Sequence, residues 1–361
     1  MERFSKTTVI ILVIYMATAM IVSPTGSINA AHSAILLCLD AIIPALFPFF
    51  VCSNLLISLG VARYLSRCFT PLTKLLFGVS GSGALPVVLG IISGYPVGAS
   101  CTAQLYSTGN CTKTEAQRLL AFCNNSGPLF ILGAVGIGMF NNQKIGVLLY
   151  ISHILSAIIV GMLFKHYGTT PHTLSLPPSV PNKPASVFSG ITDALSDAIS
   201  SILKVCGFVI LFAVFTSVLP QYKGHEFIYA LTEITGGIKA LICCNQLGNF
   251  LLPAISFFLA FSGISVMMQV AGIVIPHGLS LKTYALGKIL QGLFSFALTY
   301  ILQIVFPVAS PVFMPDGNIY TYPILSPREL FATALLCITF GLITILIMLI
   351  IGWIADKFYD E

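Results

Sequence analysis

Seven apolar segments in this sequence are each long enough to cross a lipid bilayer as a helix. Crossing the ~30 Å hydrocarbon layer takes about 20 helical residues. Charged residues make up 8% of the chain, whereas soluble domains carry about 25%, and the mean hydropathy is +0.96. The sequence therefore predicts an all-α integral membrane protein. Its predicted spans are residues 7–24, 33–59, 116–140, 145–165, 189–219, 283–304 and 329–355.

Two further apolar segments are interrupted in the middle. Residues 84–106 are broken by Ser93, Gly94 and Pro96, and residues 250–275 by Ser262 and Gly263. Each piece is too short to span a bilayer alone. Irregular backbone survives at membrane depth only where protein or a water-filled cavity satisfies its polar groups. We expect two re-entrant helical hairpins that line a cavity.

The distribution of basic residues predicts that the N-terminus is cytoplasmic. If both hairpins return to their starting side, ten lysines and arginines lie on the cytoplasmic side and six at the outer side. Such a bias sets the orientation of membrane proteins. Lys282 and Lys288 fall in the outer group. The net charge of +5 is spread over many short loops, so a nucleic-acid partner is not expected.

A shift of 169 residues aligns the two broken segments. It pairs Ser93-Gly94 with Ser262-Gly263 and gives seven identities in the 24 positions from 93 to 116. Each half reads as a span, an interfacial amphipathic segment, a broken hairpin and two spans. The predicted topology makes the halves inverted, as in many secondary transporters.

Three polar stretches at or near helix breaks are the candidate substrate site. Half-helix N-termini attract anionic groups, and free carbonyls at half-helix C-termini can coordinate a cation. The stretches are residues 93–100, 261–269 and 124–128. In the last of them Pro128 removes a backbone hydrogen bond inside an apolar span. The alternative is a set of tight turns that only allow close helix packing. The candidate substrate-binding residues are Ser93, Gly94, Tyr95, Pro96, Gly98, Ser100, Asn124, Asn125, Ser126, Gly127, Ser262, Gly263, Ser265 and Gln269.

Two formal charges, Asp40 and Lys204, fall well inside predicted spans. Ionisable residues in a membrane often mark transport pathways. Asp40 is a candidate proton or cation site, or else bonds a neighbouring helix. Lys204 is a candidate counter-charge for an acidic substrate, or else a lysine that reaches the interface.

Catalytic patterns are absent from the sequence. It has no H-E-x-x-H, G-x-S-x-G or Walker A motif and no spacing typical of a metal site. We therefore expect no enzyme activity, no metal and no cofactor, with the coupling ion left open.

Four stretches carry a resemblance to a known family: 44–49, 93–99, 122–128 and 261–264. They resemble the YlbJ-type (SpoVV-type) sporulation integral membrane proteins, which carry the nucleoside-recognition gate domain. The resemblance covers roughly residues 30–350. It implies a nucleoside-transporter-like fold, a place in the outer forespore membrane, and movement of dipicolinic acid from the mother cell toward the forespore.

With that resemblance, the sequence predicts four parts. They are an N-terminal transmembrane helix (1–28), a first gate-like repeat (29–166), a linker (167–188) and a second, inverted gate-like repeat (189–361).

The leading hypothesis is a transporter of a small organic anion, with dipicolinic acid as the implied substrate. The alternatives are a nucleoside or cation-coupled carrier of the same fold, and a non-transporting membrane scaffold for spore envelope assembly. The expected partners are the bilayer and the substrate. The oligomeric state stays open, a homo-oligomer included.

Overall fold

The computed structural model describes residues 13–15, 17–59, 61–168, 187–218, 225–244 and 247–307. All regular elements in these ranges are helices. Four helices are long and apolar enough to cross a membrane, or up to five if a bent pair counts as one span. They are Gln143–His166, Gly190–Ser217, Gly248–His277 and Leu281–Val305.

Three predicted spans, 145–165, 189–219 and 283–304, coincide with helices of this set. Large apolar side chains on them face outward, and Leu203 is 65% exposed. Contiguous exposed apolar surface of this kind suits contact with lipid. The predicted span 329–355 lies outside the described residues, and 7–24 is described only in part. The count of seven spans therefore stays a prediction.

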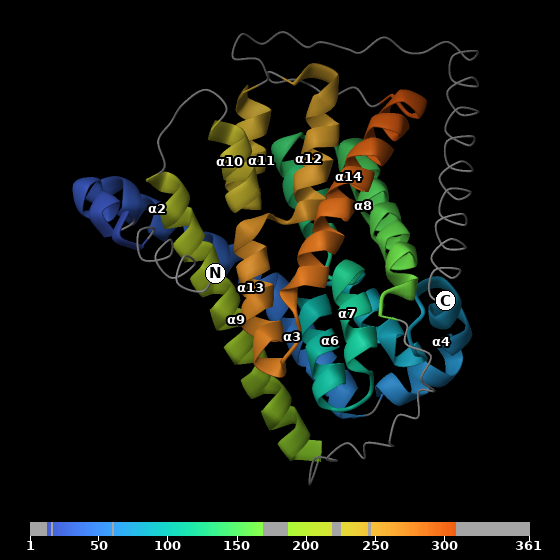
Figure 1. Cartoon of the computed structure of the whole chain (residues 1–361). Helices are drawn as coiled ribbons and strands as arrows, with labels where there is room; N and C mark the ends of the chain where they lie inside the picture. Colours follow the sequence, from blue (N-terminus) through green and yellow to red (C-terminus); the bar gives the residue numbers. More distant parts are fainter. Residues whose placement is uncertain are drawn as a thin grey trace.

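The predicted span 33–59 is part of a longer helical run. It consists of α2 (Pro24–Leu37), a π-helical turn (Cys38–Ile42) and α3 (Ile43–Ser58). The long helix α9 (Val187–Ser217) packs against it in the opposite direction, since Asn54 near the end of α3 donates to the Ala194 carbonyl near the start of α9 at 3.2 Å. Together α2, α3 and α9 form one flank of the molecule (Figure 1).

The first interrupted segment is a helical hairpin. It follows α4 (Val61–Phe77) and a short 3-10 turn (Gly81–Gly83), and consists of α5 (Ala84–Ile92) and α6 (Val97–Ser107). At its base Ser82 Oγ donates to the Asn110 carbonyl at 2.8 Å. Nearer its tip Gly90 packs on Gly98, so a Cβ added to Gly90 would lie 3.2 Å from the Gly98 Cα. The chain therefore returns to its starting side, with its tip at residues 93–96.

A second helical hairpin is formed by α10 (His225–Thr232) and α11 (Ile234–Cys244). Its tip is Glu233, and Gly237 lets the two arms touch, because a Cβ there would lie 2.1 Å from the Ala230 Cα. The sequence analysis expected an interfacial amphipathic segment between the span 189–219 and the second broken segment, and the structure has this hairpin there. The hairpin occupies the upper part of Figure 1, whereas α6 lies in the lower part, so the two hairpins approach the middle from opposite ends.

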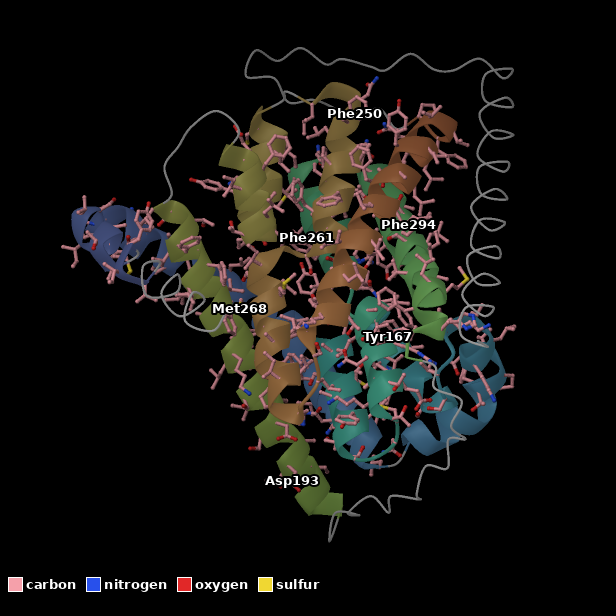
Figure 2. All side chains as sticks on the ribbon, viewed as in Figure 1. Tyr167, Asp193, Phe250, Phe261, Met268 and Phe294 are labelled. Atoms are coloured by element: carbon pink, nitrogen blue, oxygen red, sulfur yellow. The ribbon has the colours of Figure 1, made fainter. Side chains whose placement is uncertain are left out.

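The second interrupted segment is not a hairpin. Helices α12 (Leu251–Phe261) and α13 (Gly263–Val274) follow each other within one candidate span of 30 residues. Figure 2 shows Phe250, Phe261 and Met268 at successively lower levels along this path. Ser262 is left-handed with φ 68°, so the helix breaks there without reversing. The prediction of a return at this position was therefore wrong.

The predicted span 116–140 is also broken into two helical pieces, and it is not among the helices long and apolar enough to cross a membrane. It consists of α7 (Lys113–Phe122), an irregular stretch at 123–128 and the π-helical segment η3 (Leu129–Met139). A capping box starts α7, with Thr112 Oγ1 accepting from the Glu115 amide and Glu115 Oε2 accepting from the Thr112 amide. Such a box satisfies amides that the first turn leaves free.

The last two helices complete the bundle. Helix α8 (Gln143–Leu163) is followed by a 3-10 turn (Phe164–His166), and η5 (Gly248–Phe250) and η6 (Ile275–His277) flank α12 and α13. Helix α14 (Leu281–Val305) packs on α12, α8 and α7. It runs parallel to α7, since Thr283 hydrogen-bonds Gln117 and Gly287 packs on the Ala121 carbonyl.

This packing overturns the alignment by 169 residues as an inverted repeat. That alignment pairs the start of α7 with the start of α14, and the structure places these starts side by side.

Candidate functional site

The tip of the first hairpin is shaped by glycines. Gly94 has φ +93°, and a Cβ there would lie 2.8 Å from the Gly127 amide nitrogen. A Cβ on Gly98 would lie 2.2 Å from the Cys123 carbonyl oxygen. Only glycine tolerates such close backbone approach and positive φ at little cost. These glycines press the hairpin tip against the irregular stretch at 123–128.

The polar residues of that stretch cross-link four helices. Asn124 Nδ2 donates to the Tyr284 hydroxyl at 3.3 Å, and its Oδ1 accepts from the Ala99 amide at 3.3 Å. Asn125 Oδ1 accepts from Gln291 Nε2 at 2.9 Å. All three side chains from 124 to 126 are buried. Polar groups at this depth are tolerated because each has a partner.

The two helix breaks are held in the same manner by the helices that follow them. The Ser126 amide donates to His153 Nε2 of α8 at 3.0 Å. Ser262 Oγ and the Tyr284 hydroxyl of α14 lie 3.2 Å apart. Ser126 Oγ also donates to the Leu259 carbonyl of α12 at 3.2 Å, which joins the two breaks directly.

A cavity of about 220 Å³ lies where both hairpin tips meet the two breaks. Six of the predicted residues line it, and the other lining residues are largely apolar. Its wall consists of Leu37, Ile42, Leu46, Ser93, Gly94, Tyr95, Gly127, Leu129, Phe130, Ala134, Val205, Val209, Glu233, Ile234, Thr235, Ser265, Val266 and Gln269. A concave, mostly apolar pocket with a few polar groups is the usual form of a small-molecule site.

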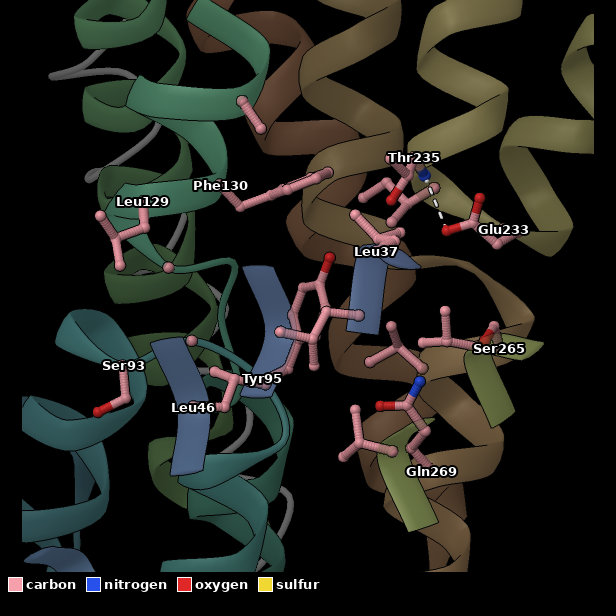
Figure 3. Close-up of a pocket in the computed structure, with 18 residues that line it drawn as sticks. Leu37, Leu46, Ser93, Tyr95, Leu129, Phe130, Glu233, Thr235, Ser265 and Gln269 are labelled. Carbon is pink, nitrogen blue, oxygen red and sulfur yellow. Dashed lines mark hydrogen bonds between the residues drawn. The ribbon is translucent and has the colours of Figure 1, made fainter. Parts of the chain in front are cut away.

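Two polar side chains of α13 face this cavity without a partner among the described residues. Gln269 is 4% exposed and Ser265 3% exposed, and neither forms a hydrogen bond within that part of the chain. Figure 3 shows the Gln269 amide directed toward the Tyr95 side of the cavity. Ser93 Oγ in the same cavity wall is buried and has no hydrogen-bond partner within the described part of the chain. A ligand in the cavity would supply hydrogen-bond partners for these groups.

Glu233 is a cavity residue that the sequence analysis missed. Its carboxylate caps α11, accepting from the amides of Thr235 at 2.9 Å and Gly236 at 2.7 Å (Figure 3). It is the one charged side chain among the lining residues. The sequence carries a signal for it, since an acidic residue directly before a helix start is a capping residue.

The sequence analysis also left Lys288 and Gln291 out of the candidate site. Lys288 is fully buried, and its Nζ donates to Gln291 Oε1 at 2.7 Å. The sequence analysis counted Lys288 among the lysines at or near the outer side, whereas the structure buries it inside the helical bundle. Two polar residues three positions apart in an apolar helix share one face, and that spacing was the available signal.

The remaining predicted residues lie around the cavity or away from it. Pro96 and Gly98 pack in the first hairpin, Ser100 is half-buried on α6, and Gly263 lies against the carbonyl of Thr232. Lys204 is exposed on α9, whereas its neighbour Val205 lines the cavity. Asp40 lies in the π-helical turn, and its side chain is outside the described part.

No basic residue reaches the cavity from the described ranges. Arg118 instead donates to the carbonyls of Tyr167, at 2.8 Å, and Gly78. The described residues also contain no group of three or more His, Cys, Asp or Glu side chains placed to hold a metal ion.

Residues 40–170, which hold the first hairpin, α7, η3 and α8, match the nucleoside recognition (Gate) family. Over 332 residues the chain is 31% identical to the sporulation integral membrane protein YlbJ of Bacillus subtilis (strain 168), with 80% of each chain covered. The chain belongs to this family of sporulation integral membrane proteins. No solved structure matches it.

Proposed function

We propose that this protein is a membrane transporter for a small planar organic compound, with dipicolinic acid as the leading candidate substrate. The observation that carries the proposal is the cavity between the hairpin tips and the helix breaks, with Gln269 and Ser265 left unpartnered inside it. Polar groups directed into a mostly apolar cavity are what a carrier needs to select its cargo.

The cavity wall fits a flat ring with polar substituents. Tyr95 and Phe130 supply aromatic surface, and the Gln269 amide and Ser265 hydroxyl supply a donor and acceptors. Aromatic side chains pack favourably against planar rings. Dipicolinate is such a ring, with two carboxylates that can accept hydrogen bonds from these groups.

Glu233 restricts the charge of the cargo. A free dianion would be repelled by a carboxylate in the same small cavity. Dipicolinate would therefore bind more weakly while Glu233 is ionised than it would beside a neutral side chain. A nucleoside is the second candidate, because a carboxylate accepts hydrogen bonds from sugar hydroxyls and the cavity holds no basic residue from the described ranges.

The proposed setting follows the family. We propose that the protein acts in the outer forespore membrane, with its N-terminus in the cytoplasm of the mother cell, and moves its cargo toward the forespore. The hairpins enter the fold from opposite ends, which suits alternating access to a central site.

Uptake of radiolabelled dipicolinate into liposomes that hold the purified protein tests the proposal, with uridine as competitor. Gln269→Ala should raise the KM for the cargo about tenfold, because a lost hydrogen bond is worth about 1–1.5 kcal/mol. It should leave the melting temperature nearly unchanged, since Gln269 has no partner among the described residues.

The matched control is Gln303→Ala. Gln303 lies near the end of α14, outside the cavity, and donates to the Asn249 carbonyl at 2.8 Å. It should transport as the wild type does. Equal uptake by the Gln269→Ala variant would contradict the proposed site. Folded protein that moves neither dipicolinate nor uridine would favour the scaffold for spore envelope assembly.

A further inference from the structure

Lys288 is a lysine buried in the middle of the helical bundle. Its side chain has no exposed surface. Its Nζ donates to Gln291 Oε1 at 2.7 Å and lies 5.9 Å from the centre of the Tyr284 ring. Among the described residues no carboxylate pairs with it.

The groups around Lys288 that can change charge are few. Cys123 at the end of α7 and His153 of α8 are close enough to interact electrostatically with Lys288, and Tyr284 lies one turn before it on α14. None of these three carries a negative charge in its usual form near neutral pH. Within the described residues the ammonium therefore lacks an anionic counter-charge.

One hydrogen-bond path joins Lys288 to the first helix break, and a contact with the Tyr284 ring leads toward the second. Through Gln291 it reaches Asn125 and the His153 carbonyl, beside the break at 123–128. Along the same face of α14, the Tyr284 hydroxyl reaches Ser262 at the other break. Lys288 is thus placed to respond to both breaks, which adjoin the cavity.

The C-terminal end of α7 also faces this part of α14. Gly287 packs so closely on α7 that an added Cβ would lie 2.2 Å from the Ala121 carbonyl oxygen. The free carbonyls at a helix C-terminus carry partial negative charge, which favours a nearby cation. In broken-helix transporters such carbonyls are where coupling ions are held.

A buried ammonium is expensive, because water no longer solvates it. Burial disfavours the charged form of a lysine, so lysines in such sites can release a proton at physiological pH. Release converts the ammonium to a neutral amine and passes one proton to water on the side to which the site is open. Re-protonation takes one proton from water on the other side.

We propose that Lys288 couples proton movement to transport, its ammonium taking the place that a metal cation would occupy between the two helix breaks. This inference rests on the proposed transport function. It predicts that cargo movement is driven by a pH gradient and is indifferent to a sodium gradient.

The test is dipicolinate accumulation in liposomes under an imposed pH gradient or sodium gradient, with uridine as a parallel cargo. Each variant is also assayed for exchange of labelled for unlabelled cargo without any gradient. Lys288→Met removes the charge, and Lys288→Arg keeps a charge that does not titrate in proteins. Lys144→Met is the control, since Lys144 is exposed at the start of α8.

Wild type and Lys144→Met should accumulate cargo under the pH gradient alone. Both Lys288 variants should lose this accumulation yet retain exchange. Substitution of a residue with only a structural role would reduce accumulation and exchange together. If Lys288→Met does not fold, Lys288→Arg decides. Accumulation by a folded Lys288 variant, or accumulation driven by sodium, would overturn the role of Lys288 and leave the proposed transport function standing. No flux of either cargo in folded wild type would overturn the transport function and this inference with it.

Discussion

At the scale of single residues, the polar side chains near the cavity divide into those with partners and those without. Asn125 is held by Gln291 and by the Phe122 carbonyl, at 2.9 Å each. Removing it would leave a buried amide of Gln291 short of a partner, at a cost of about 1–3 kcal/mol. Gln269 has no such role in the described part of the fold. Loss of transport in an Asn125 variant would therefore report on folding, and loss in a Gln269 variant on the cargo.

Glu233→Gln separates the two candidate cargos. The amide keeps the size of the side chain and removes the negative charge from the cavity. If dipicolinate enters as an anion, its KM should fall by about threefold to tenfold, because a like-charge repulsion of about 1 kcal/mol is relieved. If a nucleoside is the cargo, uridine uptake should fall, because a charge-assisted hydrogen bond is weakened.

Initial uptake rates for both compounds measure this difference. Thr235→Ser is a suitable control, since it alters the same cavity wall without changing charge. A Glu233→Gln variant that is unchanged for both compounds would show that this carboxylate only caps α11.

At the scale of helices, the glycines of the first hairpin fix where its tip lies. Gly98→Ala would drive a methyl group to 2.2 Å from the Cys123 carbonyl oxygen. Backbone on both sides must then move, and overpacking of this kind costs about 1–3 kcal/mol or more. We expect a lower melting temperature in detergent together with lost transport.

Gly207→Ala is the matched change in a helix without that contact. Gly207 lies in α9 with nothing within 4 Å of an added Cβ. Alanine favours a helix over glycine by about 1 kcal/mol, so this variant should be as stable as the wild type or more so. Equal melting temperatures for the two variants would argue against tight packing of the hairpin tip.

The sequence predicts where these helices break but not where the chain goes afterwards. Both Ser-Gly pairs mark a break, and both glycines take positive φ. At Gly94 the chain turns back because Gly90 and Gly98 allow the two arms to touch. At Ser262 the chain continues, with α12 packed on α14 and α13 packed on α9 and α6. The first break also carries Pro96 two residues after its glycine, the second has no proline there, and the contacts with distant helices differ as well.

The second hairpin escaped prediction for a related reason. Helices α10 and α11 have 8 and 11 residues, so neither gives the long apolar run that indicates a span. Their burial depends on Gly237 meeting Ala230 and on the pocket-facing tip at Glu233. Of the predicted site, the residues of the first hairpin tip and of α13 reached the cavity because they adjoin the breaks themselves.

At the scale of the whole molecule, the through-going path of α12–α13 changes the predicted topology. If this segment crosses, the loop that carries Lys282 moves to the side that carries Lys113. The structure agrees, since the starts of α7 and α14 are joined by Thr283 and Gln117. Lys144 lies at the opposite end, since its neighbour Ile145 packs in one core cluster with Leu251 at the start of α12. Basic residues then gather more strongly on one side, as the positive-inside rule requires.

Lysine labelling with a membrane-impermeant amine reagent measures this arrangement without any substitution. Lys113, Lys144 and Lys282 are all exposed. In vesicles of one orientation, mass spectrometry should find Lys113 and Lys282 modified together and Lys144 protected. Vesicles of the opposite orientation should give the reverse. Labelling of Lys282 together with Lys144 would show that the chain returns at Ser262 as a hairpin. It would then also support the inverted repeat that aligns the two Ser-Gly pairs.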